Sequence, residues 1–214
     1  MDRIGTEGGK DATKQKMNAI GIMGGTFDPI HIGHLKVAEV AASKLALERV
    51  VFVPAFCPPH KSLGDIAPVA HRFAMVSEAI AANSRFEVSG IEAGYQCPVY
   101  AGDTIRAFQK MEGDTRGIYF ITGLDAILRI VNWHHARTYP GLCQFVAATR
   151  PGYDKTRIGR EIPDAFRPYV TILEEPALSV SSTEIRRRVK TGQSIEEMVP
   201  KAVMDYIYRH GLYV

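Results

Sequence analysis

The chain has 214 residues, of which 46% are hydrophobic and 23% are charged, a composition typical of a soluble globular protein. A chain of this length buries about two thirds to three quarters of its unfolded surface, so its core needs no disulfide or structural metal. Lysine and arginine number 26 against 23 aspartates and glutamates, a formal net charge of +3. This near balance argues against nucleic acid or an anionic membrane as the default partner.

The three cysteines, Cys57, Cys97 and Cys143, lie far apart and form no CxxC pair. An odd number fits neither a disulfide framework nor a tetrahedral zinc site. We therefore expect three reduced thiols in a cytoplasmic protein.

Residues 1–17 are rich in charged side chains and contain no apolar stretch. No run in the chain approaches the roughly 18 apolar residues of a membrane span. We expect a short disordered tail over 1–17, neither a signal peptide nor a membrane anchor, followed by one domain over 18–214.

The first structured element predicted is a buried strand at Asn18–Met23, an apolar run that ends in Gly24 and Gly25. A helix follows at His34–Leu47, where apolar residues recur at helical spacing. The next strand, Arg49–Pro54, is rich in β-branched residues and stops at a proline. The three elements together have the length of a right-handed βαβ crossover.

The same alternation continues along the chain, with helices and strands predicted at Val69–Ala82, Phe86–Ser89, Asp103–Met111, Gly117–Thr122 and Leu142–Thr149. Strands that are apolar throughout are typical of a parallel sheet covered on both faces. From Ser182 onward the pattern predicts two helices, the first of them basic. The expected fold is α/β and doubly wound, with a mostly parallel sheet, a small C-terminal helical part and a ligand at the carboxyl ends of the strands.

The segment Gly24–His34, with the sequence GGTFDPIHIGH, lies at the first strand-to-helix turn. Its two leading glycines let the backbone approach a ligand, and the helix start offers free N–H groups to a phosphate. His31 and His34 are three residues apart and can project to one side. The pair could instead hold zinc, but no third ligand stands at a metal-binding spacing, and we predict no metal site. Asp28 precedes a proline and is interpreted as a turn residue.

A second phosphate site is predicted at the start of the helix that follows Ser181. Ser181 and Glu184 match a capping box, which by itself indicates only a helix start. Arg186, Arg187 and Arg188 stand in the first turns, where positive charge opposes the helix dipole, and a bound anion would relieve this conflict. Arg187 and Arg188 are equally consistent with a solvated face.

Six motifs follow one another along the chain: GGTFDPIHIGH at Gly24–His34, PPHK at Pro58–Lys61, GLD at Gly123–Asp125, the single tryptophan Trp133, RPG at Arg150–Gly152 and SSTEIR at Ser181–Arg186. In this order they resemble the nicotinate-nucleotide adenylyltransferase family of the HxGH nucleotidyltransferase superfamily. The resemblance runs from about Ala19 to Tyr213. It implies a Rossmann-like nucleotidyltransferase fold.

The resemblance also implies the reaction: the phosphate of nicotinate mononucleotide attacks the α-phosphorus of ATP, giving nicotinate adenine dinucleotide and pyrophosphate in NAD biosynthesis. A phosphate monoester, with a second pKa of about 6, needs no general base. The protein must align two anions and stabilise charge on the leaving pyrophosphate. We expect Mg²⁺ to be carried by the ATP phosphates and water, and the partners to be ATP and nicotinate mononucleotide.

The resemblance assigns roles residue by residue. The catalytic residues it implies are His31, His34 and Arg186. The ATP-binding residues it implies are Gly24, Gly25, Thr26, Phe27, His31, His34, Gly123, Asp125, Ser182, Thr183 and Arg186. The mononucleotide-binding residues it implies are Thr26, Lys61, Tyr100, Ala101, Thr104 and Trp133.

The residues themselves leave other interpretations open. Trp133 offers an indole face to an electron-poor pyridinium ring, or it belongs to the core. Lys61 could contact the phosphate of the mononucleotide, but a lysine in a surface loop is a mobile point charge that is more often simply exposed to solvent. Asp125 accepts hydrogen bonds from a ribose or caps a helix.

The segment Val99–Thr104 departs from the family's SYTxDT pattern at Val99 and Ala101. Backbone N–H groups at a helix start could still hold the acid group of nicotinate. The preference between nicotinate and nicotinamide mononucleotide therefore stays open.

Other functions remain as alternatives. A transferase for nicotinamide mononucleotide differs least, whereas one for phosphopantetheine fits the PPHK loop and Trp133 poorly. A non-catalytic nucleotide sensor would not need His31, His34 and Arg186, and all three are present. Nucleic-acid binding through Arg186–Arg188 lacks a basic stripe with interleaved aromatic residues. The sequence leaves the oligomeric state open, a homo-oligomer included.

Overall fold

The computed structural model describes residues 19–58, 62–113, 116–149, 161–173 and 180–214. The tail predicted at 1–17, with Asn18, lies outside these residues, as do Lys61 of the PPHK motif and the RPG motif at Arg150–Gly152. Statements about the structure below concern the described residues.

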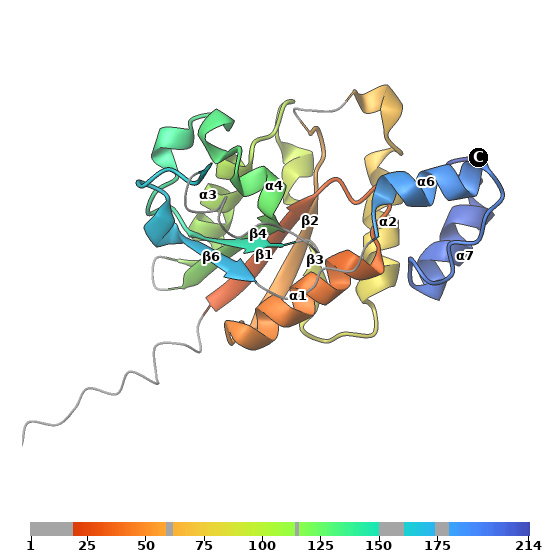
Figure 1. The fold of residues 1–214 in the computed structure, drawn as a ribbon, viewed down its shortest axis with the longest axis horizontal. Helices are drawn as coiled ribbons and strands as arrows, with labels where there is room; N and C mark the ends of the chain where they lie inside the picture. Colours follow the sequence, from red (N-terminus) through yellow and green to blue (C-terminus); the bar gives the residue numbers. More distant parts are fainter. Residues whose placement is uncertain (1–18, 59–61, 114–115, 150–160, 174–179) are drawn as a thin grey trace, which may run out of the picture.

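Six parallel strands form one sheet in the order β3-β2-β1-β4-β5-β6 (Figure 1). The strands are β1 (Ala19–Gly25), β2 (Arg49–Pro54), β3 (Phe86–Val88), β4 (Gly117–Gly123), β5 (Gln144–Ala148) and β6 (Val170–Leu173). This order and the helices on both faces confirm the predicted doubly wound α/β fold. The central strands are apolar because both of their faces are covered.

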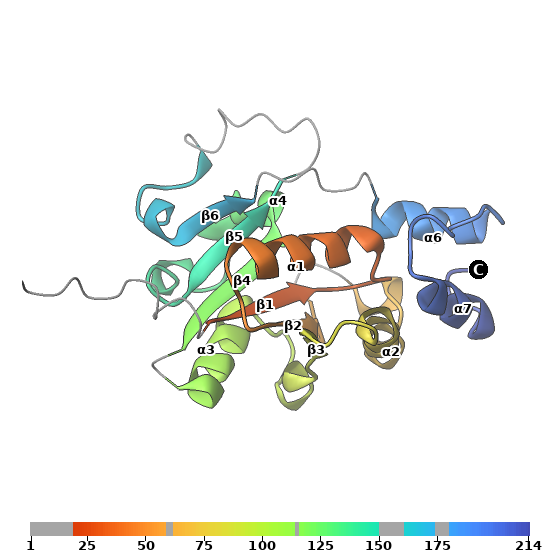
Figure 2. The same ribbon diagram turned by 90° about the horizontal axis from the view of Figure 1, so that it is seen from below.

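Helices cover the sheet on both sides, and Figure 2 shows α1 and α3 on opposite faces. The α-helices are α1 (Ile32–Lys44), α2 (Val69–Ile80), α3 (Ala101–Glu112), α4 (Leu124–Ile127), α6 (Ser182–Lys190) and α7 (Lys201–Arg209). Short 3-10 helices are η2 (Leu63–Asp65), η3 (Ile91–Gly94), η4 (Ile130–Asn132), η5 (Ala136–Thr138) and η7 (Arg167–Tyr169).

Two apolar clusters, one on each face of the sheet, form the core. Along β2, Val50 and Phe52 face the first cluster, while Val51 and Val53 face the second. This alternation is the period-2 geometry of a strand. The first cluster includes α1, α2, α6 and α7, and the second includes α3 and α4. The C-terminal helices thus share the apolar cluster of this face, although they lie beyond the strands, beside α2 (Figures 1 and 2).

The ends of the predicted elements agree with the observed ones to within two residues, except that α1 ends at Lys44 and not at Leu47. Helix α1 begins at Ile32, not at His34, and α3 begins at Ala101, not at Asp103. These shifts make His31 and Tyr100 the N-cap residues. Strand β6 was not predicted, because it has only four residues and is mostly half-buried at the sheet edge.

The prediction of three reduced thiols is wrong for two of the cysteines. Cys57 and Cys97 form a disulfide across 40 residues of sequence, while Cys143 is a buried free thiol. The fold brings the two segments together, and the N–H of Val99 donates to the Cys57 carbonyl over 3.3 Å. An odd cysteine count could not reveal this pairing, and the pairing removes the argument from thiols for a cytoplasmic location.

No helix among the described residues is long and apolar enough to cross a membrane. Helix α7 instead packs on α2, where the Tyr206 hydroxyl and Nδ1 of His71 lie within 3.0 Å.

Thiol titration tests the disulfide directly. In the native protein we expect almost no reactive thiol, since burial raises the pKa of Cys143 to about 12. After unfolding in denaturant without reductant, Cys143 alone should react, and after reduction all three cysteines should. Peptide mapping should recover Cys57 joined to Cys97. Three reactive thiols in the unreduced, unfolded protein would contradict the pairing.

Candidate active site

Two cavities open at the carboxyl ends of the central strands β1 and β4. The chain passes from β1 to β2 on one side and from β4 to β5 on the other, so the connections diverge between these strands. Such a switch point leaves a crevice where α/β proteins bind ligands. The cavities measure about 480 and 750 Å³ and share Gly24, Gly25 and Thr122. They are called the smaller and the larger cavity below.

Gly24 and Gly25 line both cavities and also admit two aromatic rings. A Cβ atom on Gly24 would lie 2.9 Å from the ring of Phe120, and one on Gly25 would lie 2.9 Å from the ring of Phe27. Both distances are well inside the contact distance of carbon atoms. The sequence predicted that a ligand approaches the backbone closely at these glycines. In the structure, the rings of Phe120 and Phe27 also approach it closely.

His31 and His34 both line the larger cavity. Their rings stack with centroids 3.7 Å apart and an interplanar angle of 21°. The backbone N–H of His31 donates to Nδ1 of His34 over 3.2 Å. Because Nδ1 accepts this bond, a neutral His34 ring carries its proton on Nε2, which is then a donor for an anion.

The pKa of His34 lies well below its ordinary value. Burial is the main cause, because it removes water from the charged ring, and the neighbouring His31 adds repulsion. At neutral pH His34 is therefore an uncharged donor. The site gains a hydrogen-bond donor at this position without a permanent charge.

Helix α6 brings its first turn to the larger cavity, which Ser182, Thr183 and Arg186 line. The Ser181 hydroxyl accepts from the N–H of Glu184 over 3.2 Å, as a helix cap does. The Ser182 hydroxyl donates to the Pro29 carbonyl over 2.9 Å. This bond joins α6 to the turn that follows β1.

The charge conflict predicted at the start of α6 is relieved in part within the helix itself. The Glu184 carboxylate pairs with Arg187 at 2.7 Å and with Arg188 at 3.0 Å. Arg187 and Arg188 are thus compensated on an exposed face of the helix. Arg186 is the arginine of this group that lines the larger cavity.

The sequence suggested that Asp28 is a simple turn residue, but the structure shows that it is more than that. It is 1% exposed, and one carboxylate oxygen lies 3.5 Å from Nη1 of Arg186. The same Nη1 donates to the Asp28 backbone carbonyl over 2.7 Å. A proline after aspartate signals a turn, but it says nothing about burial or an ion pair with a distant arginine.

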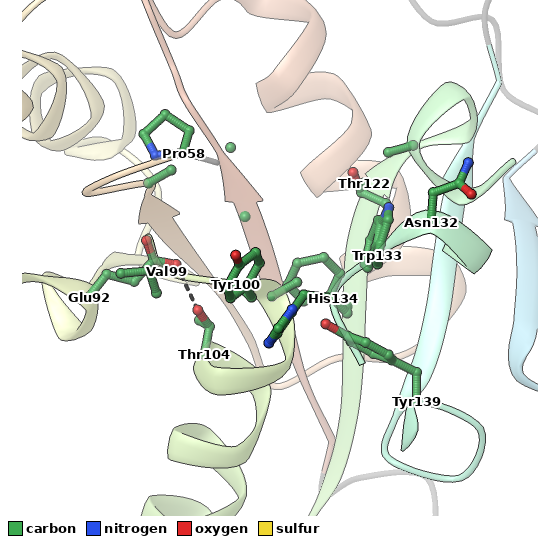
Figure 3. A pocket seen from close by; sticks show the side chains of 16 residues that line it. Pro58, Glu92, Val99, Tyr100, Thr104, Thr122, Asn132, Trp133, His134 and Tyr139 are labelled. Carbon is green, nitrogen blue, oxygen red and sulfur yellow. Dashed lines mark hydrogen bonds between the residues drawn. The ribbon is translucent and has the colours of Figure 1, made fainter. Parts of the chain in front are cut away.

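Aromatic side chains line the smaller cavity, as Figure 3 shows. The half-buried Trp133 packs edge-on against Tyr139, with centroids 5.7 Å apart, while the ring of Tyr100 stacks on His134 at 4.2 Å. Trp133 therefore belongs to the cavity wall and also packs against the core, while its contact with a pyridinium ring stays a prediction. His134 was not predicted, and its stacking on Tyr100 depends on the tertiary fold.

The start of α3 forms another wall of the smaller cavity, with Tyr100, Ala101 and Thr104. Thr104 is 1% exposed, and its hydroxyl donates to Glu92 over 2.7 Å (Figure 3). The same carboxylate accepts from the N–H of Phe56 over 3.0 Å. Glu92 thus ties the loop after β2 to the first turn of α3.

Glu92 is a residue of the cavity wall that the sequence did not predict. It is 8% exposed, and burial raises the pKa of its carboxyl group, although its two hydrogen bonds and Arg72 oppose the rise. A single glutamate in a loop belongs to no periodic pattern or motif, so the sequence did not indicate that it lines a cavity. Its role depends on the packing of two segments.

Two of the predicted site residues line neither cavity. The Thr26 carbonyl accepts from the buried Arg72 over 2.7 Å. Asp125 is exposed in α4, between Gly123 of the larger cavity and Ala126 of the smaller one. Of the other predicted residues that the structure describes, Gly24, Gly25, Phe27, His31, His34, Gly123, Ser182, Thr183 and Arg186 line the larger cavity, and Tyr100, Ala101, Thr104 and Trp133 line the smaller one.

Over the part of the chain that the structure describes, no three histidine, cysteine, aspartate or glutamate side chains come together to hold a metal ion. The charged groups at the larger cavity are cationic or compensated.

Comparison with known proteins assigns a class to this architecture. The sequence pattern of the family described as cytidylyltransferase-like matches residues 22–188. The chain therefore belongs to the cytidylyltransferase-like family.

Within that family the chain groups with proteins named nicotinate-nucleotide adenylyltransferases. A probable nicotinate-nucleotide adenylyltransferase of a Thermoanaerobacter species is 44% identical, over 91% of this chain and 93% of the relative. The corresponding protein of Moorella thermoacetica is also 44% identical, over 91% of each chain. The family resemblance of the six motifs is thereby confirmed.

The solved structure of Plasmodium falciparum nicotinic acid mononucleotide adenylyltransferase complexed with NaAD is similar in fold. Its TM-score is 0.75 at 21% identity, over 92% of this chain and 97% of that one. At this identity the likeness concerns the fold alone.

Because the carboxyl group of Glu92 is buried, we expect the free energy of unfolding to depend on pH. Its pKa is raised on folding, so its contribution is favourable below the ordinary value of 4.5 and is lost as pH rises through the folded-state value. Glutamine cannot ionise. The free energy of unfolding of Glu92→Gln, relative to the unaltered protein, should therefore increase as pH rises from about 4.5 to 7.5. Urea unfolding at several pH values measures this.

Glu184→Gln is the comparison for that measurement. Hydrogen bonds from Arg187 and Arg188 lower the pKa of Glu184 to about 2, so its carboxylate is ionised over the whole range. Above about pH 5.5, where Glu184 is ionised in the unfolded chain as well, the relative stability of Glu184→Gln should not change with pH. A flat or falling trend for Glu92→Gln would show that Glu92 is not held in a buried environment.

Proposed function

We propose that this protein transfers the adenylyl group of ATP to nicotinate mononucleotide, giving nicotinate adenine dinucleotide and pyrophosphate. The observation that carries the proposal is the pair of cavities that meet at Gly24, Gly25 and Thr122. Two substrates held side by side would bring their phosphates together at this shared wall. The relatives' name, nicotinate-nucleotide adenylyltransferase, fits two such subsites.

The larger cavity suits ATP. Hydrogen-bond donors gather there from two helix starts, with His31 and His34 on α1 and Thr183 and Arg186 on α6. Helix starts favour phosphate groups through free N–H groups and the helix dipole. The Mg²⁺ ion would arrive with the triphosphate as part of the substrate, coordinated by phosphate oxygens and water.

The smaller cavity suits a pyridine mononucleotide. The Trp133 indole and the stacked Tyr100 and His134 rings offer flat faces to the base. The start of α3 lies at the same wall, and its positive dipole end favours the carboxylate of nicotinate over an uncharged amide. Ala101 offers no hydroxyl, so the backbone would provide this preference.

Catalysis in this arrangement consists of alignment and charge stabilisation. The mononucleotide phosphate is largely dianionic at neutral pH and attacks the α-phosphorus without a base. His34 would donate from Nε2 to the phosphoryl group that is transferred, with His31 stacked beside it. Arg186 would stabilise the departing pyrophosphate.

Release of pyrophosphate tests the proposal. The protein is incubated with ATP, Mg²⁺ and either nicotinate or nicotinamide mononucleotide, and product is identified by mass spectrometry. We expect pyrophosphate with nicotinate mononucleotide and a lower kcat/KM with the nicotinamide form, because the start of α3 favours a carboxylate. A higher kcat/KM with the nicotinamide form would reverse the assigned substrate. No release of pyrophosphate with either mononucleotide would contradict the proposal and favour a non-catalytic nucleotide sensor.

His34→Ala should lower kcat by about 100-fold or more, the size of effect seen when a donor to a developing oxyanion is removed. The free energy of unfolding should fall by only about 1 kcal/mol, since one hydrogen bond at the start of α1 is lost. Steady-state kinetics and urea unfolding measure the two effects. His210→Ala, at an exposed position after α7, is the control and should keep its activity. Unchanged turnover in His34→Ala would exclude the proposed role of His34.

A further inference from the structure

The C-terminal end of the chain returns to the turn that follows β1. The hydroxyl of Tyr213, the residue before the last, donates to one carboxylate oxygen of Asp28 over 2.8 Å, across 185 residues of sequence. In Figures 1 and 2 the C-terminus lies beside α6, whose first turn borders the larger cavity. The contact thus joins the end of the chain to the part of the molecule that carries His31 and Arg186.

Asp28 is held from three directions. The carboxylate oxygen that accepts from Tyr213 also accepts from the N–H of Ala67, over 3.1 Å. The other carboxylate oxygen lies 3.5 Å from Nη1 of Arg186, which donates to the Asp28 carbonyl over 2.7 Å. With the carboxylate 1% exposed, little water is available to replace any of these partners.

The two arginines near Asp28 have different surroundings. The Asp28 carboxylate lies near the guanidinium groups of Arg186 and the buried Arg72, and Arg72 also interacts with the carboxyl group of Glu92. Arg72 is turned away from the cavity, toward the carbonyls of Ala67 and Thr26. Arg186 is the member that lines the larger cavity. Asp28 therefore fixes one end of the Arg186 guanidinium while the side chain still borders the cavity.

We propose that Asp28 and Tyr213 are positioning residues for the reaction, acting through Arg186 to hold its guanidinium toward the phosphates of ATP. This rests on the proposed function, in which ATP occupies the larger cavity. Tyr213 orients the Asp28 carboxylate, and Asp28 orients Arg186. Burial and the Asp28 charge both raise the pKa of Tyr213, so its hydroxyl stays protonated and remains a donor.

The test is Tyr213→Phe, which removes one hydroxyl and keeps the ring. We expect ATP affinity, measured by calorimetry without the second substrate, to weaken roughly three- to tenfold, in line with loss of a hydrogen bond to a charged group. Binding of nicotinate mononucleotide, followed by the fluorescence of the single tryptophan Trp133, should stay within about twofold. Asp28→Asn should weaken ATP binding further, because it removes the charge that holds Arg186.

Tyr208→Phe is the matched control, since Tyr208 is on α7 and is 52% exposed. It should leave binding of both ligands unchanged. In an Arg186→Ala background, Tyr213→Phe should have no further effect on ATP affinity, since the route through Arg186 is gone.

Three results would overturn the proposal: unchanged ATP affinity in Tyr213→Phe, equal weakening of both ligands together with a lower Tm, or a full effect in the Arg186→Ala background. Because ATP binding is measured without turnover, these results are distinct from failure of the proposed function. That failure would appear as absent pyrophosphate release in the unaltered protein.

Discussion

The carboxylate of Asp28 is buried in the turn between the central strand β1 and helix α1. A buried carboxylate left without partners would destabilise the fold by several kcal/mol, so the surrounding chain must supply them. It does so from remote segments: Ala67 before α2, Arg186 in α6 and Tyr213 at the C-terminus. Residues of the C-terminal part, Arg186 and Tyr213, thus help to hold the turn that precedes the histidine pair.

Around this charge, the strand order explains why a site exists here. Connections diverge on either side of β1 and β4, and the turns after these strands border two cavities with a common wall. Gly24 and Gly25 make that wall thin enough for the rings of Phe120 and Phe27 to pack against it. A reaction between two bound phosphates needs such adjoining subsites, because alignment supplies much of the rate.

The net charge of the chain is only +3, and the structure shows how charged groups near the larger cavity are paired. Glu184 compensates Arg187 and Arg188 on the exposed face of α6, and Asp28 shares Arg186 with the larger cavity. His34 adds a donor that is neutral at pH 7 because burial lowers its pKa. The larger cavity thus combines one guanidinium group with uncharged donors, a combination that suits a small polyanion.

From the sequence alone, apolar runs and their spacing determined the α/β fold, and the Gly24–His34 and Ser181–Arg186 motifs determined most residues of the larger cavity. These signals are local, since a strand, a cap or a glycine turn depends on neighbouring residues. The short edge strand β6, the Cys57–Cys97 pair, the burial of Asp28 and the Glu92–Thr104 bond were decided only by the tertiary structure. Each joins segments between 12 and 185 residues apart or depends on packing, and local sequence patterns do not report which distant groups will meet.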